Sequence, residues 1–260
     1  MLGESNHGSA KRTARLSAMM DRLGDQLLEA LSPTRCAGCE RLGSLVCDEC
    51  LNRLELIDPG LACARCGAPF GRMLCTECYG VEVATQACLA CATFQDPLSR
   101  MIRAYKDGGE RRLAPLFAEM LYDTALHAQR FDPQRFGAFL DGSDFLLFVP
   151  ATARAFQRRG FDHMEAVARS LGDLSGVPFV DALVKHGVGD QREMGRAQRI
   201  EGSRGVYEVV EPLIPVVRGA SILLIDDVIT TGATVTAVAT ALRDAGAASV
   251  RALALARVMG

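Results

Sequence analysis

The sequence has few aromatic residues and almost no net charge, and it lacks a long apolar run. Among its 260 residues there is no tryptophan and there are only four tyrosines, and the formal net charge is −2 at pH 7. A net charge this small produces no overall field toward nucleic acid or a membrane surface, so any basic surface must be local. No stretch approaches the roughly 20 consecutive apolar residues that a membrane-spanning helix needs, so no membrane span is expected.

A secretory signal peptide is not expected either, because the first residues are polar and carry no hydrophobic run. We therefore expect a cytoplasmic protein, and disulfides are rare in that compartment. The remaining composition is that of a globular protein, with 49% hydrophobic and 23% charged residues. The length suffices for one sizeable domain and a small appendage.

Cysteine, in contrast, is abundant and confined to one part of the chain. All ten cysteines fall between Cys36 and Cys91, in five Cys-x-x-Cys pairs. Two such pairs separated by a short spacer are typical of a tetrahedral zinc site with four thiolate ligands. The spacing predicts two structural zinc sites, one formed by Cys36, Cys39, Cys47 and Cys50 and one by Cys63, Cys66, Cys75 and Cys78. Interleaved ligation across the two halves, or a single ion, is also compatible with the spacing.

The cysteine-rich residues 36–80 have few long apolar runs, so a small domain here needs metal in place of a conventional core. The fifth pair, Cys88 and Cys91, lies instead in an apolar, strand-like segment with no partner pair nearby. Residues three apart on a strand point to opposite faces, so both thiols cannot easily reach one metal. We expect these two to be buried free thiols.

The chain divides by composition into four parts. Residues 1–12 are polar and are predicted to be a disordered tail, and residues 13–33 carry leucine and methionine at helical spacing up to Pro33. This amphipathic helix is expected to dock on the rest of the protein, with a membrane-surface or partner helix as the alternative. Residues 34–82 form the predicted double zinc ribbon, and residues 83–260 the main domain.

The main domain alternates strand and helix patterns. Strands are predicted at 85–94, 144–150, 177–184, 220–226 and 249–257. Helices are predicted at 96–109, 110–128, 161–176 and 233–246, the second of them interrupted early by Pro115. Residues 185–205 are polar and are predicted to be a loop. Such alternation predicts an α/β fold with a parallel sheet flanked by helices.

Residues 221–237, SILLIDDVITTGATVTA, combine a buried strand with an acidic turn. The apolar run from Ile222 to Ile225 predicts a central parallel strand that ends at Asp226, where ligands of such sheets bind. Residues 230–234 then lead into a helix, whose first amides are unpaired and lie at the positive end of the helix dipole. Two carboxylates beside an anion site fit a sugar phosphate, since the acids accept bonds from hydroxyls while the turn holds the phosphate. The plainer alternative is a pair of acids that caps a turn, followed by Thr230 as a helix cap.

The stretch ILLIDDVITTGAT closely resembles the phosphoribosyl pyrophosphate signature of type I phosphoribosyltransferases. The resemblance implies that Asp226 and Asp227, as the catalytic acids, contact the 2′- and 3′-hydroxyls of the ribose. It implies that the 5′-phosphate is wrapped by Thr230, Thr231, Gly232, Ala233 and Thr234. It also implies the fold of that family, a parallel sheet flanked by helices. The negative charge of the acids would stabilise positive charge that develops at the sugar ring.

The whole arrangement resembles the ComF family of bacterial competence proteins, with an apolar helix, a double zinc ribbon and a phosphoribosyltransferase-like domain. Further stretches that carry this resemblance are AYKDGGERRLAPLFAEML, FVPATARAFQRRGFDHMEAVA and DQREMGRAQRIEGSRGVYEV. The chain departs from the family pattern in having VPAT where Pro-Val-Pro is common, and Gly-Phe-Asp at 160–162 in place of Gly-Phe-Asn. These departures bear on the diphosphate contacts and not on the fold.

A protein that binds the diphosphate of such a ligand must supply hydrogen-bond donors and positive charges. The turn at Val149–Thr152 follows a predicted strand, so its backbone at Pro150 and Ala151 is a candidate for diphosphate binding. The candidates to neutralise the charge are Arg158, Arg159 and Lys106, with Mg²⁺ as the counterion. A single Arg or Lys is more often a solvated surface charge, so each assignment is weak by itself.

Three functions are compatible with this sequence. The resemblance favours a ComF-like protein that binds phosphoribosyl pyrophosphate and assists uptake of single-stranded DNA in natural transformation, with DNA-uptake or recombination proteins as partners. An active phosphoribosyltransferase with an unidentified, nucleobase-like acceptor is one alternative, and a sensor without turnover is the other. DNA would follow a basic stripe of Arg154, Arg158, Arg159, Arg192, Arg196, Arg199 and Arg204, with Phe156, Phe161 and Tyr207 as stacking groups. A solvated surface loop is the plainer interpretation of that stripe.

Overall fold

The computed structural model describes residues 33–63, 65–69, 74–80, 83–186 and 205–259. The predicted N-terminal tail and all but the last residue of the predicted amphipathic helix lie outside these ranges. Most of the predicted loop at 185–205 also lies outside them, together with four arginines of the basic stripe, Arg192, Arg196, Arg199 and Arg204.

The centre of the fold is a four-stranded parallel sheet. It contains β1 (Ala87–Thr93), β2 (Phe145–Phe148), β5 (Ser221–Ile229) and β6 (Ser249–Arg257), in the order β1-β6-β5-β2. Every neighbouring pair in this order is parallel. The sheet confirms the predicted α/β fold with a parallel sheet flanked by helices.

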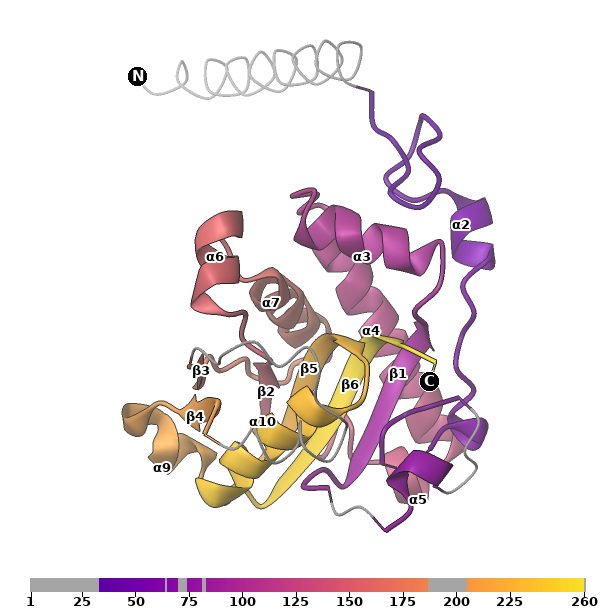
Figure 1. Ribbon diagram of the computed structural model, residues 1–260. Helices are drawn as coiled ribbons and strands as arrows, with labels where there is room; N and C mark the ends of the chain where they lie inside the picture. The colour runs from indigo at the N-terminus through magenta and orange to yellow at the C-terminus, as the bar shows by residue number, and fades with distance from the viewer. Residues whose placement is uncertain (1–32, 64, 70–73, 81–82, 187–204, 260) are drawn as a thin grey trace, which may run out of the picture.

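Four longer helices pack around the sheet (Figure 1). They are α3 (Leu98–Lys106), α4 (Leu113–Phe131), α7 (His163–Ser175) and α10 (Ala233–Asp244). Helix α10 lies in front of the sheet in Figure 1, where it connects β5 to β6. Helices α4 and α7 pack against each other, and α4 also contacts β1 and β6 while α7 contacts β2 and β5. The predicted interruption of α4 at Pro115 is wrong, because this proline occupies the third helical position, within a first turn that needs no intrahelical N–H donor.

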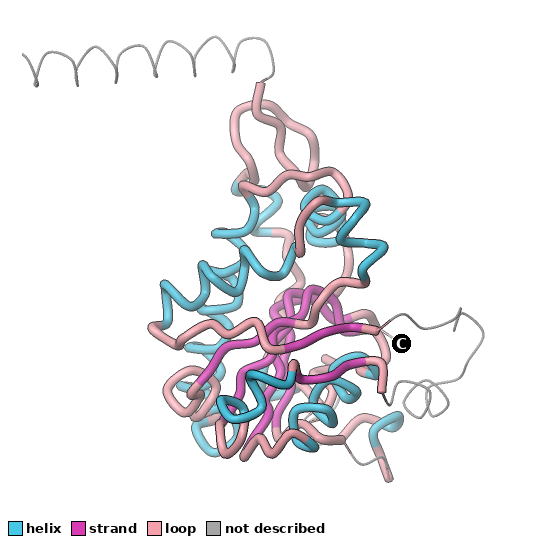
Figure 2. The backbone as a smooth tube through the Cα atoms, turned by 90° about the vertical axis from the view of Figure 1, so that its left-hand side faces the viewer, coloured by secondary structure: helices cyan, strands magenta, loops and turns pink. Residues whose placement is uncertain are grey.

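The remaining elements are short. They are α2 (Asp48–Asn52), η1 (Pro59–Leu61), η2 (Thr76–Cys78), α5 (Pro133–Phe136), α6 (Ala153–Arg159), β3 (Leu183–Lys185), β4 (Tyr207–Val209), η3 (Glu211–Leu213) and α9 (Ile214–Val217). In Figures 1 and 2 the loop that leads into α2 lies at the top of the molecule, beyond the end of the sheet. No helix in the described part of the chain combines the length and the apolar character that a membrane crossing requires.

The strand predicted at 177–184 is divided between two sheets. Phe179 joins the edge of the central sheet by a single parallel bridge to Leu146, whereas β3 pairs antiparallel with β4 in a separate two-stranded sheet. Pro178 accepts a bond from the Leu146 amide at 2.8 Å and has no N–H to donate. A proline of this kind is tolerated at a sheet edge but does not support a longer paired strand.

The core of the protein follows the apolar run of β5. Ile222, Leu223, Leu224 and Ile225 are each 0% exposed, as expected for a strand that is covered on both faces. The strand does not end at Asp226, as the sequence predicts, but continues to Ile229, because Val228 and Ile229 still pair with Ala256 and Arg257 of β6. Both acids are therefore part of the strand near its carboxyl end.

Candidate functional site

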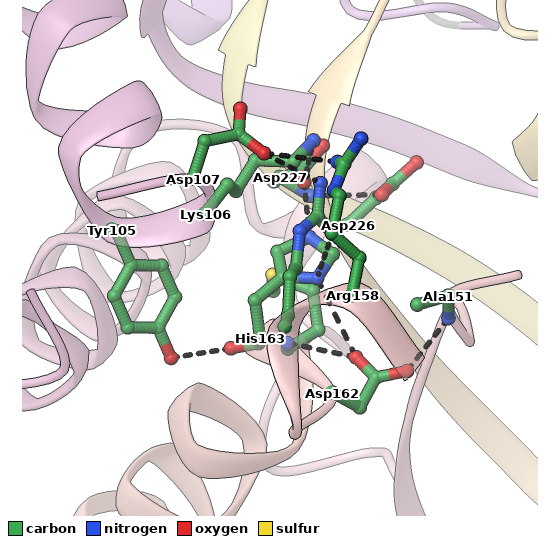
Figure 3. Close-up of polar contacts among 11 residues, drawn as sticks. Tyr105, Lys106, Asp107, Ala151, Arg158, Asp162, His163, Asp226 and Asp227 are labelled. Carbon is green, nitrogen blue, oxygen red and sulfur yellow. Dashed lines mark hydrogen bonds and ion pairs between the residues drawn. The ribbon is translucent and has the colours of Figure 1, made fainter. Parts of the chain in front are cut away.

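The side chains of Asp226 and Asp227, near the carboxyl end of β5, lie close to residues of α3 and α7 (Figure 3). The two acids are 8% and 7% exposed, so neither is a surface carboxylate. Successive residues of a strand point to opposite faces, so the two side chains have different neighbours although they adjoin in the sequence. These different neighbours give the two carboxyls opposite pKa shifts.

Asp227 is held by a lysine and a histidine. Lys106 Nζ, at the end of α3, lies 2.5 Å from Asp227 Oδ2, and His163 Nε2 bonds to the same oxygen. Burial by itself raises the pKa of this carboxyl, but the hydrogen bond from His163 and the ammonium of Lys106 outweigh burial and lower the pKa to about 2. Asp227 is therefore ionised at neutral pH and forms a buried ion pair.

Asp226 has no such cation in direct contact among the described residues. Its Oδ1 accepts the backbone N–H of Asp227 at 2.9 Å. Burial, and then the negative charge of Asp227, raise the pKa of Asp226 well above its usual value. The charges of Lys106 and of Lys185 on β3 lower the pKa of Asp226 by less than burial and Asp227 raise it. The ammonium of Lys185 lies 5.0 Å from the centre of the Tyr207 ring, and burial lowers its pKa.

His163 is fixed in place at the beginning of α7. Its carbonyl accepts a hydrogen bond from the hydroxyl of Tyr105, and its Nδ1 lies 3.4 Å from Arg159 Nη1. Nδ1 also lies 3.6 Å from Asp162 Oδ1, so the imidazole ring lies between the carboxylates of Asp162 and Asp227.

Asp107, next to Lys106, forms ion pairs with both arginines that the sequence analysis names as candidates for diphosphate binding. Arg158 Nη2 lies 3.1 Å and Arg159 Nη2 lies 3.2 Å from Asp107 Oδ1. The Arg159 side chain is only 11% exposed, and its buried Nε has no hydrogen-bond partner in the described part of the chain. The structure thus brings Lys106, Arg158 and Arg159 together around the acids, as Figure 3 shows for the first two.

The turn at Val149–Thr152 is tied to the start of α7 by Asp162. The Ala151 amide donates to Asp162 Oδ2 at 2.6 Å, while Asp162 Oδ1 accepts the Met164 amide at 3.0 Å as the cap of α7. Thr152 in turn caps α6 through its hydroxyl. The Ala151 amide is therefore engaged within the protein, and diphosphate binding by Pro150 and Ala151 stays a prediction.

Residues Thr230–Thr234, named here the phosphate loop, join β5 to α10. Gly232 has φ 79° and is the N-cap of α10, and no side chain caps the helix at this position. The left-handed backbone explains glycine here, since other residues adopt it at a cost. The Ala233 amide makes one long contact, 3.4 Å to Thr231 Oγ1. The first turn of α10 therefore presents amide donors at its positive end, as an anion site requires.

Eight of the cysteines form two compact groups, each with its four sulfurs within 4.8 Å of one another. The Cys36 group contains Cys36, Cys39, Cys47 and Cys50, and the Cys63 group contains Cys63, Cys66, Cys75 and Cys78. This result resolves the ligand pairing left open by the sequence in favour of consecutive pairs over interleaved ones.

The sulfur geometry of both groups fits a tetrahedral metal. Sulfur–sulfur distances of 3.7 Å occur in the Cys36 group and between Cys66 and Cys75. Four sulfurs at about 2.3 Å from one zinc ion would lie about 3.8 Å apart. Backbone amides also point at the sulfurs, with Cys47 N at 3.4 Å from Cys36 Sγ and Cys75 N at 3.3 Å from Cys63 Sγ. These donors stabilise thiolates, the form in which cysteine binds metal.

Cys88 and Cys91 belong to neither group. They lie on β1 and are 1% and 2% exposed, which confirms the prediction of buried free thiols. Burial raises the pKa of each thiol to about 12, so both are protonated at neutral pH.

Sequence reasoning missed three residues of the site, namely Asp162, His163 and Lys185. Asp162 and His163 follow the Gly-Phe pair in the sequence, and Asp162 was considered only as a departure from a family pattern. A histidine alone gives no signal, and its partner Asp227 is 64 residues away in the sequence. Only the packing of α7 beside β5 brings them together.

The aromatic residues of the predicted DNA stripe differ in their exposure. Phe156 on α6 is 49% exposed, whereas Tyr207 is 6% exposed. The guanidinium of Arg111 lies over the Phe161 ring at 4.1 Å, so one face of that ring is covered. In the described part of the stripe, Phe156 is therefore the aromatic side chain most available for base stacking.

Comparisons with known proteins agree with this arrangement for part of the chain. Residues 155–260 match the family model of the phosphoribosyl transferase domain, a region that includes α7, β5, the phosphate loop and α10. A search among curated proteins finds no match.

Several solved structures are similar to parts of the chain. Glutamine phosphoribosylpyrophosphate amidotransferase from B. subtilis, complexed with ADP and GMP, is 25% identical over 45% of this chain and 24% of its own, with a TM-score of 0.31. A structure described as the allosteric regulatory enzyme of purine biosynthesis is 24% identical over the same shares, with a TM-score of 0.29. The hypoxanthine-guanine phosphoribosyl transferase of L. donovani is 17% identical over 55% of this chain and 67% of its own, with a TM-score of 0.31. The chain spans about a quarter of the length of the first two, and TM-scores this low carry no argument about function.

Proposed function

We propose that this protein binds phosphoribosyl pyrophosphate, or a related ribose 5-phosphate, at the carboxyl end of β5. The observation that carries the proposal is that two buried acids directly precede a loop and a helix N-terminus that no side chain caps. A ligand that fits must offer hydroxyls to the acids and a phosphate to the amides, and a phosphorylated pentose offers both. The match of residues 155–260 to the phosphoribosyl transferase domain supports the same conclusion.

In this proposal each group of the site has a separate task. The amides and hydroxyls of the phosphate loop hold the 5′-phosphate. The ribose hydroxyls contact Asp226 and Asp227, and at Asp227 they do so beside Lys106 and His163 or in their place, because these two residues already contact Oδ2. The cations Lys106, Arg158 and Arg159 balance the charge of the diphosphate, with Mg²⁺ as its counterion.

We also propose that the Cys36 group and the Cys63 group each hold one structural zinc ion. Four thiolates at sulfur–sulfur distances of 3.7 Å are suited to Zn²⁺, and a closed set of four ligands leaves no position for a reacting water. In both groups the metal would replace the apolar core that this segment lacks. We retain a cytoplasmic location, where thiols stay reduced, as part of this proposal.

The chemistry that such a ligand permits is transfer of the ribose 5-phosphate to an acceptor. A nucleophilic nitrogen forms a bond to C1′ as the C1′–O bond to the diphosphate breaks, and pyrophosphate leaves with the electron pair. The proton of the acceptor nitrogen passes to solvent. The ionised Asp227 would stabilise the positive charge that develops on the ribose ring. A sensor that binds the ligand without turnover uses the same contacts, and release of pyrophosphate with a panel of nucleobases separates the two.

Isothermal titration calorimetry with phosphoribosyl pyrophosphate and Mg²⁺ tests the binding proposal. We expect one site per chain in the wild type, and loss of measurable binding in the double variant Asp226→Asn/Asp227→Asn. The matched control is Asp173→Asn, an exposed acid on α7 that should bind as the wild type does. An athermic wild-type titration, repeated by equilibrium dialysis with the same negative result, would overturn the proposal.

A second candidate function is binding of single-stranded DNA, as the ComF resemblance implies, with DNA-uptake proteins as partners. It is favoured by one observation: α6 buries none of its residues, so Arg154, Phe156 and Arg158 are exposed on one short helix, and Arg158 pairs with Asp107. Fluorescence anisotropy with a labelled single-stranded oligonucleotide over a salt series tests it. We expect the variant Arg154→Gln/Phe156→Ala to weaken binding and to reduce the salt slope by about one. Absence of binding at low salt would remove this candidate.

A further inference from the structure

Arg257, the last residue of β6, lies where the central sheet meets the cysteine-rich segment. It is 2% exposed, and its register partner is Ile229, the last residue of β5. Its Nε donates to the Cys66 carbonyl at 3.1 Å and its Nη2 to Cys66 Sγ at 3.7 Å. Its Nη1 donates to the carbonyls of Ile229, at 3.4 Å, and of Thr230. One side chain thus connects a predicted metal ligand with the first residue of the phosphate loop.

The geometry of these contacts depends on a planar group with donors on two sides. The edge formed by Nε and Nη2 faces Cys66, while Nη1 faces the end of β5. A guanidinium has five N–H donors in a fixed arrangement and can serve both sides at once. A lysine ammonium at the same place is a single point of charge and cannot hold both sides in the same way.

The charge of Arg257 also needs an explanation, because a buried cation is costly unless a negative charge lies nearby. Its partners among the described residues are carbonyl oxygens and one sulfur rather than carboxylates. Four thiolates around one Zn²⁺ carry a net charge of about −2. The loaded Cys63 group is therefore a suitable counterion for the guanidinium.

The Cys63 group also lies close to the phosphate loop itself. A Cβ atom added to Gly232 would be 4.0 Å from the Cβ of Cys66, which is ordinary van der Waals contact. The Cys36 group has different neighbours: its Gly38 packs beside Pro97 and Glu40 pairs with Arg100 at 2.9 Å, both at the start of α3. The two groups are therefore unlike in their relation to the phosphate loop.

We propose that Arg257 is a positioning residue that couples the metal state of the Cys63 group to the shape of the phosphate loop. Metal in the Cys63 group fixes Cys66, Arg257 then holds the Ile229 and Thr230 carbonyls, and the amides of the loop are held in place for the 5′-phosphate. This inference rests on the proposed function, since it takes phosphoribosyl pyrophosphate as the ligand of the loop. The Cys36 group has no such coupling.

Coupling of this kind is reciprocal, which gives a test on the wild-type protein. If metal in the Cys63 group strengthens ligand binding, the ligand must strengthen metal binding by the same factor. We expect saturating phosphoribosyl pyrophosphate with Mg²⁺ to raise the affinity for one of the two zinc ions about ten-fold, measured by equilibrium competition with a zinc-selective chelator. The affinity for the second zinc ion should be unchanged.

Variants identify which of the two groups holds the protected zinc ion, and whether Arg257 connects that group with the phosphate loop. In Cys39→Ser the remaining zinc should still be protected by the ligand, and in Cys66→Ser protection should be lost. Arg257→Lys should bind the ligand about ten-fold more weakly, with zinc content retained and zinc affinity no longer raised by the ligand. The matched control is Arg135→Lys, because Arg135 donates to the carbonyls of Pro59 and Ala62 just before Cys63 but not to the phosphate loop. Its ligand affinity should stay within about two-fold of the wild type.

Circular dichroism melting of both Arg→Lys variants checks that a loss of affinity is not a loss of fold. If Arg257→Lys melts early, the chelator experiment on the wild type still decides the matter. Normal ligand binding with the affinity for both zinc ions unchanged by the ligand overturns the coupling and leaves the proposed function intact. No ligand binding by the wild type overturns the proposed function, and the coupling falls with it.

Discussion

Residues 33–80 and the central sheet are held together by different means. In the first region five of the eight grouped cysteines are buried, and large apolar residues such as Leu42, Leu56 and Tyr79 remain 60%, 71% and 82% exposed. In the second, the residues from Ile222 to Ile225 are fully buried among other apolar side chains. The zinc sites that we propose thus lie where the chain has few buried apolar residues, and hydrophobic burial stabilises the part where it has many.

The difference teaches where the candidate site obtains its rigidity. The acids and the phosphate loop extend from the best-buried strand, so their backbone is fixed by the sheet. The Thr230 carbonyl of the loop accepts a bond from Arg257, which also donates to Cys66, so this side of the loop is linked to the cysteine-rich region. A treatment that acts on only one of these two regions should therefore change the stability of the fold and the affinity for the ligand to different extents.

Removal of metal should have the largest effect, and it should act on one region only. Structural zinc contributes about 10 kcal/mol to the folding of small domains, so we expect residues 33–80 to unfold when chelator removes both ions. Trypsin should then cut at Arg41 and Arg53, while the sheet and its helices stay resistant. Mass spectrometry of the fragments checks this, and a protein that remains uncut after metal loss would contradict the comparison.

A cavity in the central sheet should have the next largest effect, a loss in the free energy of unfolding of the sheet. Leu224→Ala removes a fully buried side chain, and such changes cost about 2–5 kcal/mol. Denaturant unfolding measures the loss, and zinc content should remain at two ions per chain. Leu174→Ala on α7, where leucine is 44% exposed, is the control and should cost much less.

The two neighbouring acids should respond in opposite directions to the same substitution. Asp227→Asn leaves Lys106 and His163 without their carboxylate, and the lowered pKa of Asp227 corresponds to a cost of about 2 kcal/mol at neutral pH. Asp226→Asn removes a buried carboxyl whose ionised form is disfavoured, so stability should be unchanged or higher. Thermal melting at pH 7 compares the variants, and equal destabilisation by both would contradict the assigned environments.

The smallest effect concerns the pH dependence of these two variants. The pKa of Asp227 is about 2 in the folded protein and about 3.9 in an unfolded chain, so its stabilisation is present above pH 4 and is lost as the pH falls toward 2. The cost of Asp227→Asn should shrink over that interval. The pKa of Asp226 is raised, so any gain from Asp226→Asn should appear only as the pH rises above about 4. Denaturant unfolding from pH 2 to pH 7 measures both trends.

Much of the fold was predictable because strong local patterns agree with it. The apolar run before Asp226, the small residues of the phosphate loop and the helix pattern that follows each indicate the same strand-turn-helix unit. The two groups of cysteines were equally predictable, because ligand spacing is a local property. The exact end of β5 was not, since its last residues are fixed by pairing with Ala256 and Arg257 of another strand.

The chemistry around the acids was predictable only in part. The sequence identified Asp226, Asp227, Lys106, Arg158 and Arg159 as candidates, and the structure brings them together. It gave no indication of His163, because an isolated histidine has no pattern. Nor did it indicate Arg257, whose partners Cys66 and Thr230 lie 191 and 27 residues away.

By itself, then, the sequence determined the main strands and the four longer helices, which cysteines can share a metal, and which residues form the loop after the acids. Each of these rests on spacing within a few residues. The tertiary structure alone decided that Asp227 is ionised while the pKa of Asp226 is raised, and that Arg257 connects Cys66 with the phosphate loop. Burial, charge pairing and contact between distant segments arise only when the sheet, α3, α7 and the cysteine-rich region pack together.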